Sequence, residues 1–250
     1  MKIDFQDQTV LVTGATRGMG KQFADDFAKL GADLILTGTD KDKIETLNRE
    51  ARRDKQSSRK YYAVDFANAE STKAFIEAID AYQKIDVCIN NAGINRINFI
   101  DETLIEDWKE ILAVNLEAPF MITRAVSRLM KKNRYGRIIN IASIFGIISK
   151  AKRSIYTTTK FGLHGLTVTA AIELAPYNVL VNSVSPGFVL TELTKSILSE
   201  AEMEDLARQV PMGRFAEPDE ISRVVLFLAS SLNTYLTGQN IVVDGCFVNV

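Results

Sequence analysis

The stretch Thr13-Gly14-Ala15-Thr16-Arg17-Gly18-Met19-Gly20 connects an apolar segment to a segment with helical spacing. The apolar run at 9–13 predicts a strand, and the apolar positions that recur every three to four residues over 19–30 predict a helix. In a glycine-rich turn between a strand and a helix, the backbone and the positive end of the helix can approach a pyrophosphate. The spacing is Gly-x-x-x-Gly-x-Gly, a variant of the more common Gly-x-Gly-x-x-Gly. The stretch therefore predicts a dinucleotide site at the first strand of an α/β fold.

Strand-like and helix-like segments alternate along the rest of the chain, with a polar, basic segment at 52–60 that predicts a solvated loop. Apolar strands that alternate with helices are typical of βαβ units and of a parallel sheet buried on both faces. We therefore expect one α/β domain over 1–250, a doubly wound Rossmann fold with a seven-stranded parallel sheet and helices on both faces. The expected strands are 9–13, 34–37, 61–65, 86–90, 137–143, 179–184 and 240–244, and the expected helices are 19–30, 41–53, 71–82, 105–132, 154–174 and 218–230.

Composition excludes several classes of protein. The chain has 250 residues, 46% of them hydrophobic and 24% charged, which is ordinary for a soluble domain. A net charge of −1 gives the basic segment at 52–60 no support as a nucleic-acid site. Cys88 and Cys246 form no Cys-x-x-Cys pair and there is one histidine, so we expect no metal. The chain shows no signal peptide and no apolar run of about 18 residues, which predicts a cytoplasmic protein without a membrane span.

A second group of residues predicts proton transfer. Tyr156 and Lys160 are four residues apart on an expected helix, so their side chains lie on one face about 6 Å apart. At an effective dielectric constant of about 20, an ammonium about 4 Å from the phenol favours the phenolate by roughly 4 kcal/mol. Because this corresponds to about three pKa units, we expect a Tyr156 pKa near the operating pH of an acid–base catalyst. Ser143, at the end of an apolar strand, could donate a hydrogen bond to the oxygen that is oxidised or reduced.

Taken in order, these motifs resemble the short-chain dehydrogenase/reductase family over essentially the whole chain. The resemblance is closest to 3-oxoacyl-carrier-protein reductases and to gluconate- or sugar-type dehydrogenases. It implies reversible hydride transfer between a nicotinamide and a secondary alcohol or ketone. The matching residues are Gly14, Gly18 and Gly20; Asn90-Asn91-Ala92-Gly93; Asn115 within Val114-Asn115-Leu116; Ser143, Tyr156 and Lys160; and Pro186-Gly187, followed by Thr191.

The resemblance also implies which residues bind the cofactor. Asp65 would bind the adenine, Lys160 would bind the nicotinamide ribose, and Asn115 would kink its helix and hold a water that relays protons to Lys160. The implied catalytic residues are Ser143, Tyr156, Lys160 and Asn115. The implied cofactor-binding residues are Gly14, Thr16, Arg17, Gly18, Met19, Gly20, Thr39, Asp65, Phe66, Asn91, Ala92, Gly93, Tyr156, Lys160, Pro186, Gly187, Val189 and Thr191.

The cofactor is predicted to be NADP rather than NAD. An acidic residue at the end of the second strand would accept the ribose 2′-hydroxyl of NAD and repel a 2′-phosphate, and similarity to the family places Gly38 there. Arg17 and Thr39 could bind the phosphate. Asp40 leaves NAD open, since it could turn inward to the ribose, although it could equally cap the helix at 41–53.

The substrate is encoded less clearly. Arg96, Lys152 and Arg153 could bind a carboxylate or phosphate, or could belong to solvated loops. They favour a polar sugar, polyol or sugar acid under a lid at about 188–209. The alternative substrate is a 3-oxoacyl carrier protein, attracted by the basic segment at 128–134. A non-catalytic dinucleotide-sensing regulator is a further alternative.

The resemblance also implies a homodimer or homotetramer. Family members usually pair the helices that correspond to 105–132 and 154–174 across a dimer interface, and they often form tetramers through the last strand. His164 is expected at an interface or in the core. Cys246, where relatives commonly have glycine, is expected to affect packing rather than chemistry.

Overall fold

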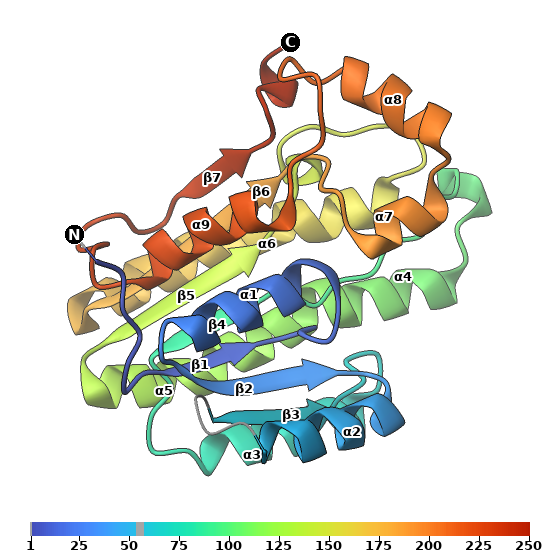
Figure 1. Cartoon of the computed structure of the whole chain (residues 1–250). Coiled ribbons are helices and arrows are strands. Elements are labelled where there is room, and N and C mark those ends of the chain that lie inside the picture. Colours follow the sequence, from blue (N-terminus) through green and yellow to red (C-terminus); the bar gives the residue numbers. More distant parts are fainter. Residues whose placement is uncertain (1, 54–57) are drawn as a thin grey trace.

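Seven parallel strands form a single sheet in the computed structural model, which describes residues 2–53 and 58–250 (Figure 1). The strands lie in the order β3-β2-β1-β4-β5-β6-β7, and each neighbouring pair is parallel. The expected seven-stranded parallel sheet is confirmed. The strands are β1 (Thr9–Val12), β2 (Asp33–Gly38), β3 (Arg59–Ala63), β4 (Val87–Asn90), β5 (Gly136–Ile141), β6 (Val179–Pro186) and β7 (Asn240–Val243).

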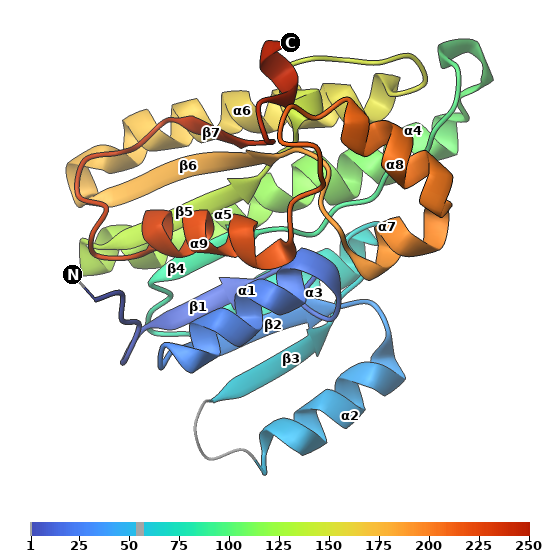
Figure 2. The same ribbon diagram turned by 45° about the horizontal axis from the view of Figure 1, so that its top comes forward.

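Helices cover both faces of the sheet (Figure 2). Phe23 and Val225 belong to the buried cluster on the face covered by α1, α2 and α9, whereas Phe75, Ile122 and Ala170 belong to the cluster under α3, α5 and α6. Burial on both faces explains the continuous apolar runs of the central strands. The helices are α1 (Gly18–Lys29), α2 (Lys41–Ala51), α3 (Ala69–Asp80), α4 (Ile105–Leu112), α5 (Ala118–Asn133), α6 (Ser154–Leu174), α7 (Glu192–Ile197), α8 (Glu200–Arg208) and α9 (Pro218–Ala229).

The strand order reverses next to β1. From β1 the chain builds outward to β2 and β3 and then returns to β4 on the opposite side of β1. The connections that leave the carboxyl ends of β1 and β4 therefore diverge, and a crevice opens between them. In open α/β sheets this is the place where ligands bind.

Two predicted segments differ from the structure. The expected helix at 105–132 is interrupted by one turn of π-helix, Ala113–Glu117, which separates α4 from α5. The expected loop at 52–60 ends earlier, because Arg59 and Lys60 already pair with β2, and Arg59 forms an ion pair with Asp25. Residues 54–57 of that loop, including Lys55, lie outside the described residues.

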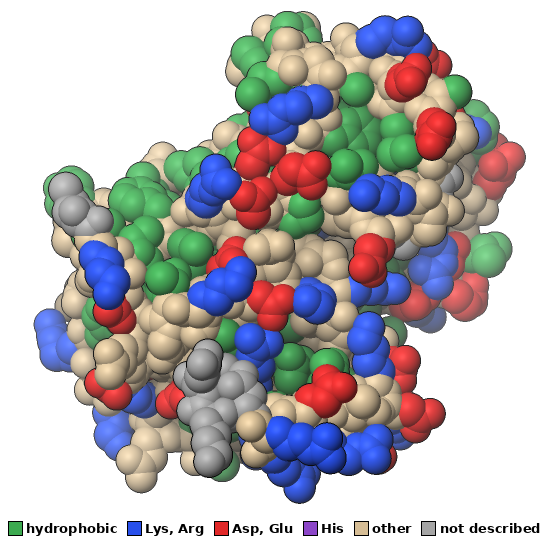
Figure 3. All heavy atoms as spheres, viewed as in Figure 1, with side chains coloured by type: hydrophobic (Ala, Val, Ile, Leu, Met, Phe, Trp, Pro, Cys, Tyr) green, Lys and Arg blue, Asp and Glu red, His purple; other side chains and the backbone are tan. Residues whose placement is uncertain are grey.

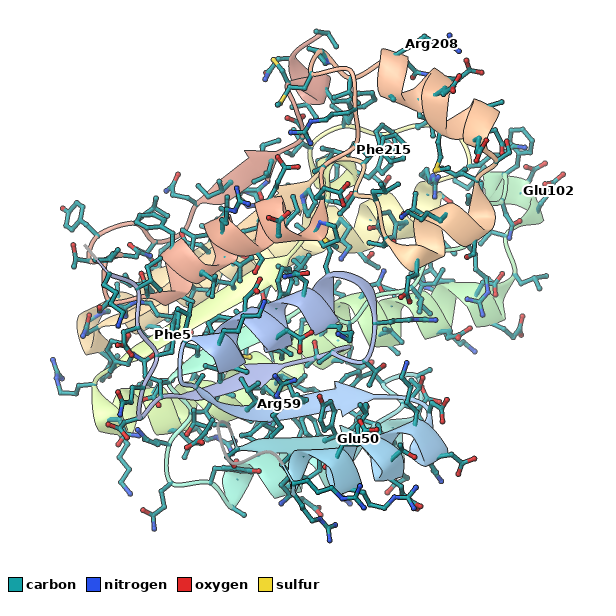
Figure 4. All side chains as sticks on the ribbon, viewed as in Figure 1. Phe5, Glu50, Arg59, Glu102, Arg208 and Phe215 are labelled. Carbon is teal, nitrogen blue, oxygen red and sulfur yellow. The ribbon has the colours of Figure 1, made fainter. Side chains whose placement is uncertain are left out.

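A helical excursion follows β6 and contains α7 and α8. Its two ends are held together, because Leu190 donates a backbone hydrogen bond to Ala216 at 2.8 Å and Ala216 donates one to Phe188 at 2.9 Å. The Phe188 ring stacks on Phe215, which lies beneath α8 (Figure 4), and it meets Phe247 edge-on. Figure 3 shows hydrophobic side chains gathered beside α8. The segment expected to form a lid thus packs on a cluster of three aromatic rings, Phe188, Phe215 and Phe247.

Across residues 2–53 and 58–250, no helix combines the length and the apolar character needed to cross a bilayer.

Candidate active site

A cavity of about 340 Å³ lies in the crevice at the carboxyl ends of β1 to β4. It joins the glycine-rich turn to the connections that follow β2, β3 and β4, as expected for a dinucleotide site. Thirteen residues named from the sequence line it: Gly14, Thr16, Arg17, Gly18, Met19, Gly20, Thr39, Asp65, Phe66, Asn91, Ala92, Gly93 and Thr191.

The glycine-rich turn packs against the connection after β4. A Cβ atom at Gly20 would lie 2.2 Å from the Gly14 carbonyl oxygen and 2.4 Å from Nδ2 of Asn91, so only glycine fits at this position. The Thr13 hydroxyl accepts hydrogen bonds from the backbone N–H groups of Asn91 and Ala92, both at 2.9 Å. These contacts fix the two walls of the cavity relative to each other.

The end of β2 has no acidic side chain directed at the cavity. A Cβ atom at Gly38 would lie 2.4 Å from the Thr16 side chain, so a larger residue there would require Thr16 to move. Asp40 caps α2 and accepts a 3.0 Å hydrogen bond from the Lys43 backbone. The capping alternative for Asp40 therefore holds. Exposed Arg17 and Thr39 lie at the cavity wall, and Arg17 has no carboxylate partner within 2–53 and 58–250.

The three residues expected to transfer protons come together beyond this cavity. Ser143 caps the 3₁₀ turn Ile144–Gly146 after β5, and α6 carries Tyr156 and Lys160. Nζ of Lys160 donates a 2.8 Å hydrogen bond to the Ile141 carbonyl and lies 5.5 Å from the centroid of the Tyr156 ring. A Cβ atom built on Gly93 would be 3.7 Å from this Nζ, so Lys160 adjoins the cavity wall.

Burial governs the protonation of this group. Burial raises the pKa of the Tyr156 phenol, although a hydrogen bond with Ser143 and the positive charge of Arg153 act in the opposite direction. Burial also lowers the pKa of the Lys160 ammonium to about 8. The prediction that Lys160 brings the tyrosine pKa down toward neutrality is therefore wrong. Desolvation of the phenol outweighs the effects that lower its pKa, and the Lys160 ammonium is directed at a backbone carbonyl.

Asn115 is buried in the π-helical turn. Its Oδ1 accepts from the Ile94 N–H and its Nδ2 donates to the Ile94 carbonyl, both at 2.8 Å, and Nδ2 also reaches Thr159. A Cβ atom on Gly93 would lie 3.5 Å from Oδ1 of Asn115. The helix is irregular at the residue expected to kink it, and π-turns are frequent at functional sites. The water relay from Asn115 to Lys160 stays a prediction.

The three basic residues named for the substrate have different surroundings. Arg96 forms ion pairs with Asp107 at 2.8 Å and with Glu110 at 2.5 Å, so α4 already supplies it with carboxylate partners, and its contact with a substrate stays a prediction. The exposed Lys152 places its ammonium 4.3 Å from the centre of the Phe99 ring. Arg153 alone is half-buried and close enough to Tyr156 to influence its titration.

Some wall residues were missed from the sequence, and some predicted residues lie elsewhere. The missed residues are Thr37, Gly38, Val64, Ala67, Ile94, Glu110, Val114 and Glu192. Most of them flank a named residue, so chain continuity could have indicated them, whereas Glu110 of α4 has no such signal. Pro186, Gly187 and Val189 do not line this cavity, and their contact with the nicotinamide stays a prediction.

Among the described residues, no three His, Cys, Asp or Glu side chains gather in a way that could hold an ion. Cys88 is buried in β4 and Cys246 is exposed near the C-terminus.

Comparisons with known proteins agree with this geometry. The family model described as enoyl-(acyl carrier protein) reductase matches residues 14–247. The chain is 41% identical over 246 residues to a 3-oxoacyl-[acyl-carrier-protein] reductase of Aquifex aeolicus, covering 98% of this chain and 99% of the relative. It is 34% identical over 244 residues to the reductase of the same name from Escherichia coli, covering 97% and 98% of the two chains.

Two solved structures are similar over their whole length. A gluconate 5-dehydrogenase of Burkholderia cenocepacia, in complex with NADP and tartrate, matches with a TM-score of 0.90 and 29% identity, covering 99% of this chain and 98% of the other. A candidate NAD(P)-dependent gluconate 5-dehydrogenase of Beutenbergia cavernae with bound NADP matches with a TM-score of 0.92 and 30% identity, covering 99% of each chain. The chain thus belongs to the short-chain dehydrogenase/reductase family, whose members are NAD(P)-dependent oxidoreductases acting on CH–OH groups.

Proposed function

We propose that this protein is an NADP(H)-dependent oxidoreductase that interconverts a secondary alcohol and a ketone. The observation that carries the proposal is the position of Gly93, which lines the dinucleotide cavity and also adjoins Nζ of Lys160 and Oδ1 of Asn115. The acid–base residues and the cofactor cavity therefore share a wall, so proton and hydride can reach one substrate carbon–oxygen bond.

Tyr156, Ser143 and Lys160 have different roles in the proposed reaction. A bound nicotinamide supplies or accepts the hydride. Because its pKa is raised, Tyr156 keeps its proton at neutral pH and donates it to the substrate oxygen in the reductive direction. The Ser143 hydroxyl stabilises the charge that develops on that oxygen. Lys160 holds positive charge beside the phenol and binds the nicotinamide ribose.

NADP is proposed as the cofactor for electrostatic reasons. Gly38 presents no carboxylate to a 2′-phosphate, Asp40 is engaged as a helix cap, and Arg17 stands at the cavity wall. The relatives solved with NADP support this choice. The ratio of kcat/KM for NADPH to that for NADH tests it, and a strong preference for NADH would end the proposal.

The substrate proposed first is a polar sugar, polyol or sugar acid, since the structural relatives include gluconate dehydrogenases and one of these was solved with a hydroxy acid. The second candidate is a 3-oxoacyl carrier protein, because the curated relatives carry that activity in their names. Oxidation of NADPH at 340 nm in the presence of 5-oxogluconate, or of an acetoacetyl thioester on a carrier protein, distinguishes the two. A protein that binds NADPH but oxidises it with neither class of ketone would support the non-catalytic regulator instead.

A homodimer or homotetramer in the cytoplasm completes the proposal. Large apolar side chains are exposed on the helices expected to pair, with Trp108 at 39%, Phe120 at 53% and Phe161 at 48% exposure. An apolar groove lined by Leu112, Leu116 and Leu166 adjoins Phe120. Light scattering tests the assembly, and a monomer at micromolar concentration would contradict it.

A further inference from the structure

A guanidinium group stands beside the tyrosine that transfers the proton. Arg153 is the N-cap of α6, three residues before Tyr156, and is half-buried. Its Cζ lies 5.4 Å from the centroid of the Phe145 ring, and that ring meets the Tyr156 ring edge-on with centroids 6.4 Å apart. The Phe145 ring thus contacts both groups. The guanidinium carbon lies at most the sum of these two distances from the centre of the Tyr156 ring.

Arg153 has no anionic partner among the described residues, as is also true of buried Arg137, whose guanidinium instead donates to the backbone carbonyls of Gly136, Asn178 and Asn233. Arg59 pairs with Asp25, Arg96 with Asp107 and Glu110, and Arg214 with Glu220, whereas within the described residues no carboxylate lies within ion-pair distance of Arg153. Arg153 forms no side-chain hydrogen bond with the described residues, and none of its side-chain nitrogen atoms is fully buried. The guanidinium nitrogens therefore stay accessible.

Leaving such a group without a partner has an energetic cost. Partial removal of a cation from water is unfavourable when no anion compensates it, and burial lowers the pKa of Arg153. A carboxylate supplied from outside the chain would remove this penalty through two parallel charge-assisted hydrogen bonds. The position is thus suited to a ligand, while the contact with the Phe145 ring holds the guanidinium in place.

We infer that Arg153 binds the carboxylate of a short oxo- or hydroxy-acid substrate whose reacting carbon lies at Tyr156. This inference rests on the proposed oxidoreductase function and specifies its substrate class. A carrier protein does not fit as the source of the anion, because its phosphate is separated from the 3-oxo carbon by the entire pantetheine arm, whereas Arg153 contacts a ring that itself contacts Tyr156. A free acid of a few carbons places both groups correctly.

Matched ketones with and without a carboxylate test the inference. Suitable pairs are acetoacetate with ethyl acetoacetate, and 5-oxogluconate with L-sorbose, each measured with NADPH. The readout is the ratio of kcat/KM for the acid to kcat/KM for its neutral partner. For at least one pair, we expect the ratio in the wild type to exceed ten and to fall at least tenfold in Arg153→Met, with part of the preference kept in Arg153→Lys.

Lys150→Met provides the control, since it removes the same charge from an exposed side chain of the same loop that is not among the residues named for the substrate. It should leave the ratio unchanged. If Arg153 acted only through the titration of Tyr156, Arg153→Met would change both members of a pair equally and move the pH profile, and this result would overturn the inference. A wild type that reduces the neutral ketones without preferring either acid would overturn it while leaving the proposed function standing. A wild type that reduces none of the four would also overturn the inference, and the proposed function would then rest on the carrier-protein substrate.

Discussion

The ammonium of Lys160 lies 5.5 Å from the centre of the Tyr156 ring and donates its hydrogen bond to the Ile141 carbonyl instead of to the phenol. Both groups are affected by burial, which raises the pKa of the tyrosine and lowers that of the lysine. The pair is therefore suited to hold a proton on the phenol at neutral pH. This state is the one that the proposed reduction requires, because the phenol must protonate a developing alkoxide.

Removal of the phenolic hydroxyl tests this role directly. We expect Tyr156→Phe to lower kcat by about 10²- to 10⁴-fold, the usual contribution of a positioned general acid. Because Tyr156 is outside the cavity wall formed by the glycine-rich turn, NADPH should bind the variant with a Kd close to that of the wild type. Stopped-flow reduction kinetics and fluorescence titration with NADPH measure the two quantities. Turnover close to the wild-type value would rule out the proposed mechanism.

The two directions of the reaction should respond oppositely to pH. Reduction requires a protonated Tyr156 and a charged Lys160, so its kcat/KM should stay level from pH 6 to about 8 and then fall as Lys160, with a pKa of about 8, loses its proton. Oxidation requires a deprotonated phenol, whose pKa is raised, so its rate should increase with pH over the alkaline range. Initial rates in both directions from pH 6 to 10 provide the measurement. A reduction rate that increases above pH 8 would contradict the assignment.

Lys160 should contribute activity at the expense of stability. It is 4% exposed, and its pKa is lowered from 10.5 to about 8. At about 1.4 kcal/mol per pKa unit this costs about 3 kcal/mol at pH 7, and the hydrogen bond to Ile141 returns about 1 kcal/mol. We therefore expect Lys160→Met to be inactive and to have a free energy of unfolding about 2 kcal/mol above the wild type at pH 7.

The pH dependence of that difference gives a second check. Between pH 8 and 10.5 the unfolded chain binds more protons at residue 160 than the folded protein does, so the wild type gains stability as pH rises. The advantage of Lys160→Met should therefore shrink at pH 10. Urea unfolding at the two pH values measures it, with the exposed Lys21→Met as control. A variant less stable than the wild type at pH 7 would show that the hydrogen bond outweighs desolvation.

Arg17 should determine much of the preference for NADPH. A charge-assisted hydrogen bond to the 2′-phosphate contributes about 1.5–3 kcal/mol. Arg17→Met should therefore lower the ratio of kcat/KM for NADPH to that for NADH by about 10- to 100-fold. Lys21→Met serves as the control, because Lys21 lies in the first turn of α1, just after Arg17, and is paired with Asp25. An unchanged ratio in Arg17→Met would show that Arg17 does not bind the 2′-phosphate of NADPH.

Two helical glycines, Gly20 and Gly165, differ in how tightly they are packed, so the effect of an added methyl group can be compared between them. Gly20→Ala introduces a methyl group 2.2 Å from the Gly14 carbonyl, so the turn must open, and we expect NADPH affinity to fall more than tenfold with a loss of stability. Gly165→Ala lies on α6 with no atom within 4 Å of the new methyl, and it should be neutral or stabilising. Calorimetric titration and thermal unfolding distinguish the two. Normal NADPH binding by Gly20→Ala would show that the turn does not contact the dinucleotide.

Most of the architecture follows from local patterns. The alternation of apolar strands and amphipathic helices, and the glycines at 14, 18 and 20, predict the sheet, its parallel strands and the position of the dinucleotide cavity. Strand burial and turn geometry depend on residues close together in the chain, so these predictions hold. The π-turn at Asn115 lies inside a segment whose apolar spacing suits an uninterrupted helix. Only the resemblance to the family implied a kink there, and in the structure Asn115 bonds Ile94, a residue 21 positions away.

The amino-acid sequence by itself therefore determined the family, the fold and the residues that meet at the site. The electrostatics of these residues depend on tertiary packing: the Tyr156 pKa is raised, Asp107 and Glu110 pair with Arg96, and no carboxylate of residues 2–53 and 58–250 pairs with Arg153. The physical reason is that a charge in a protein depends on its distance from water and from other charges. Those distances are established when α4, α6 and the strands pack together, and no spacing along the chain encodes them.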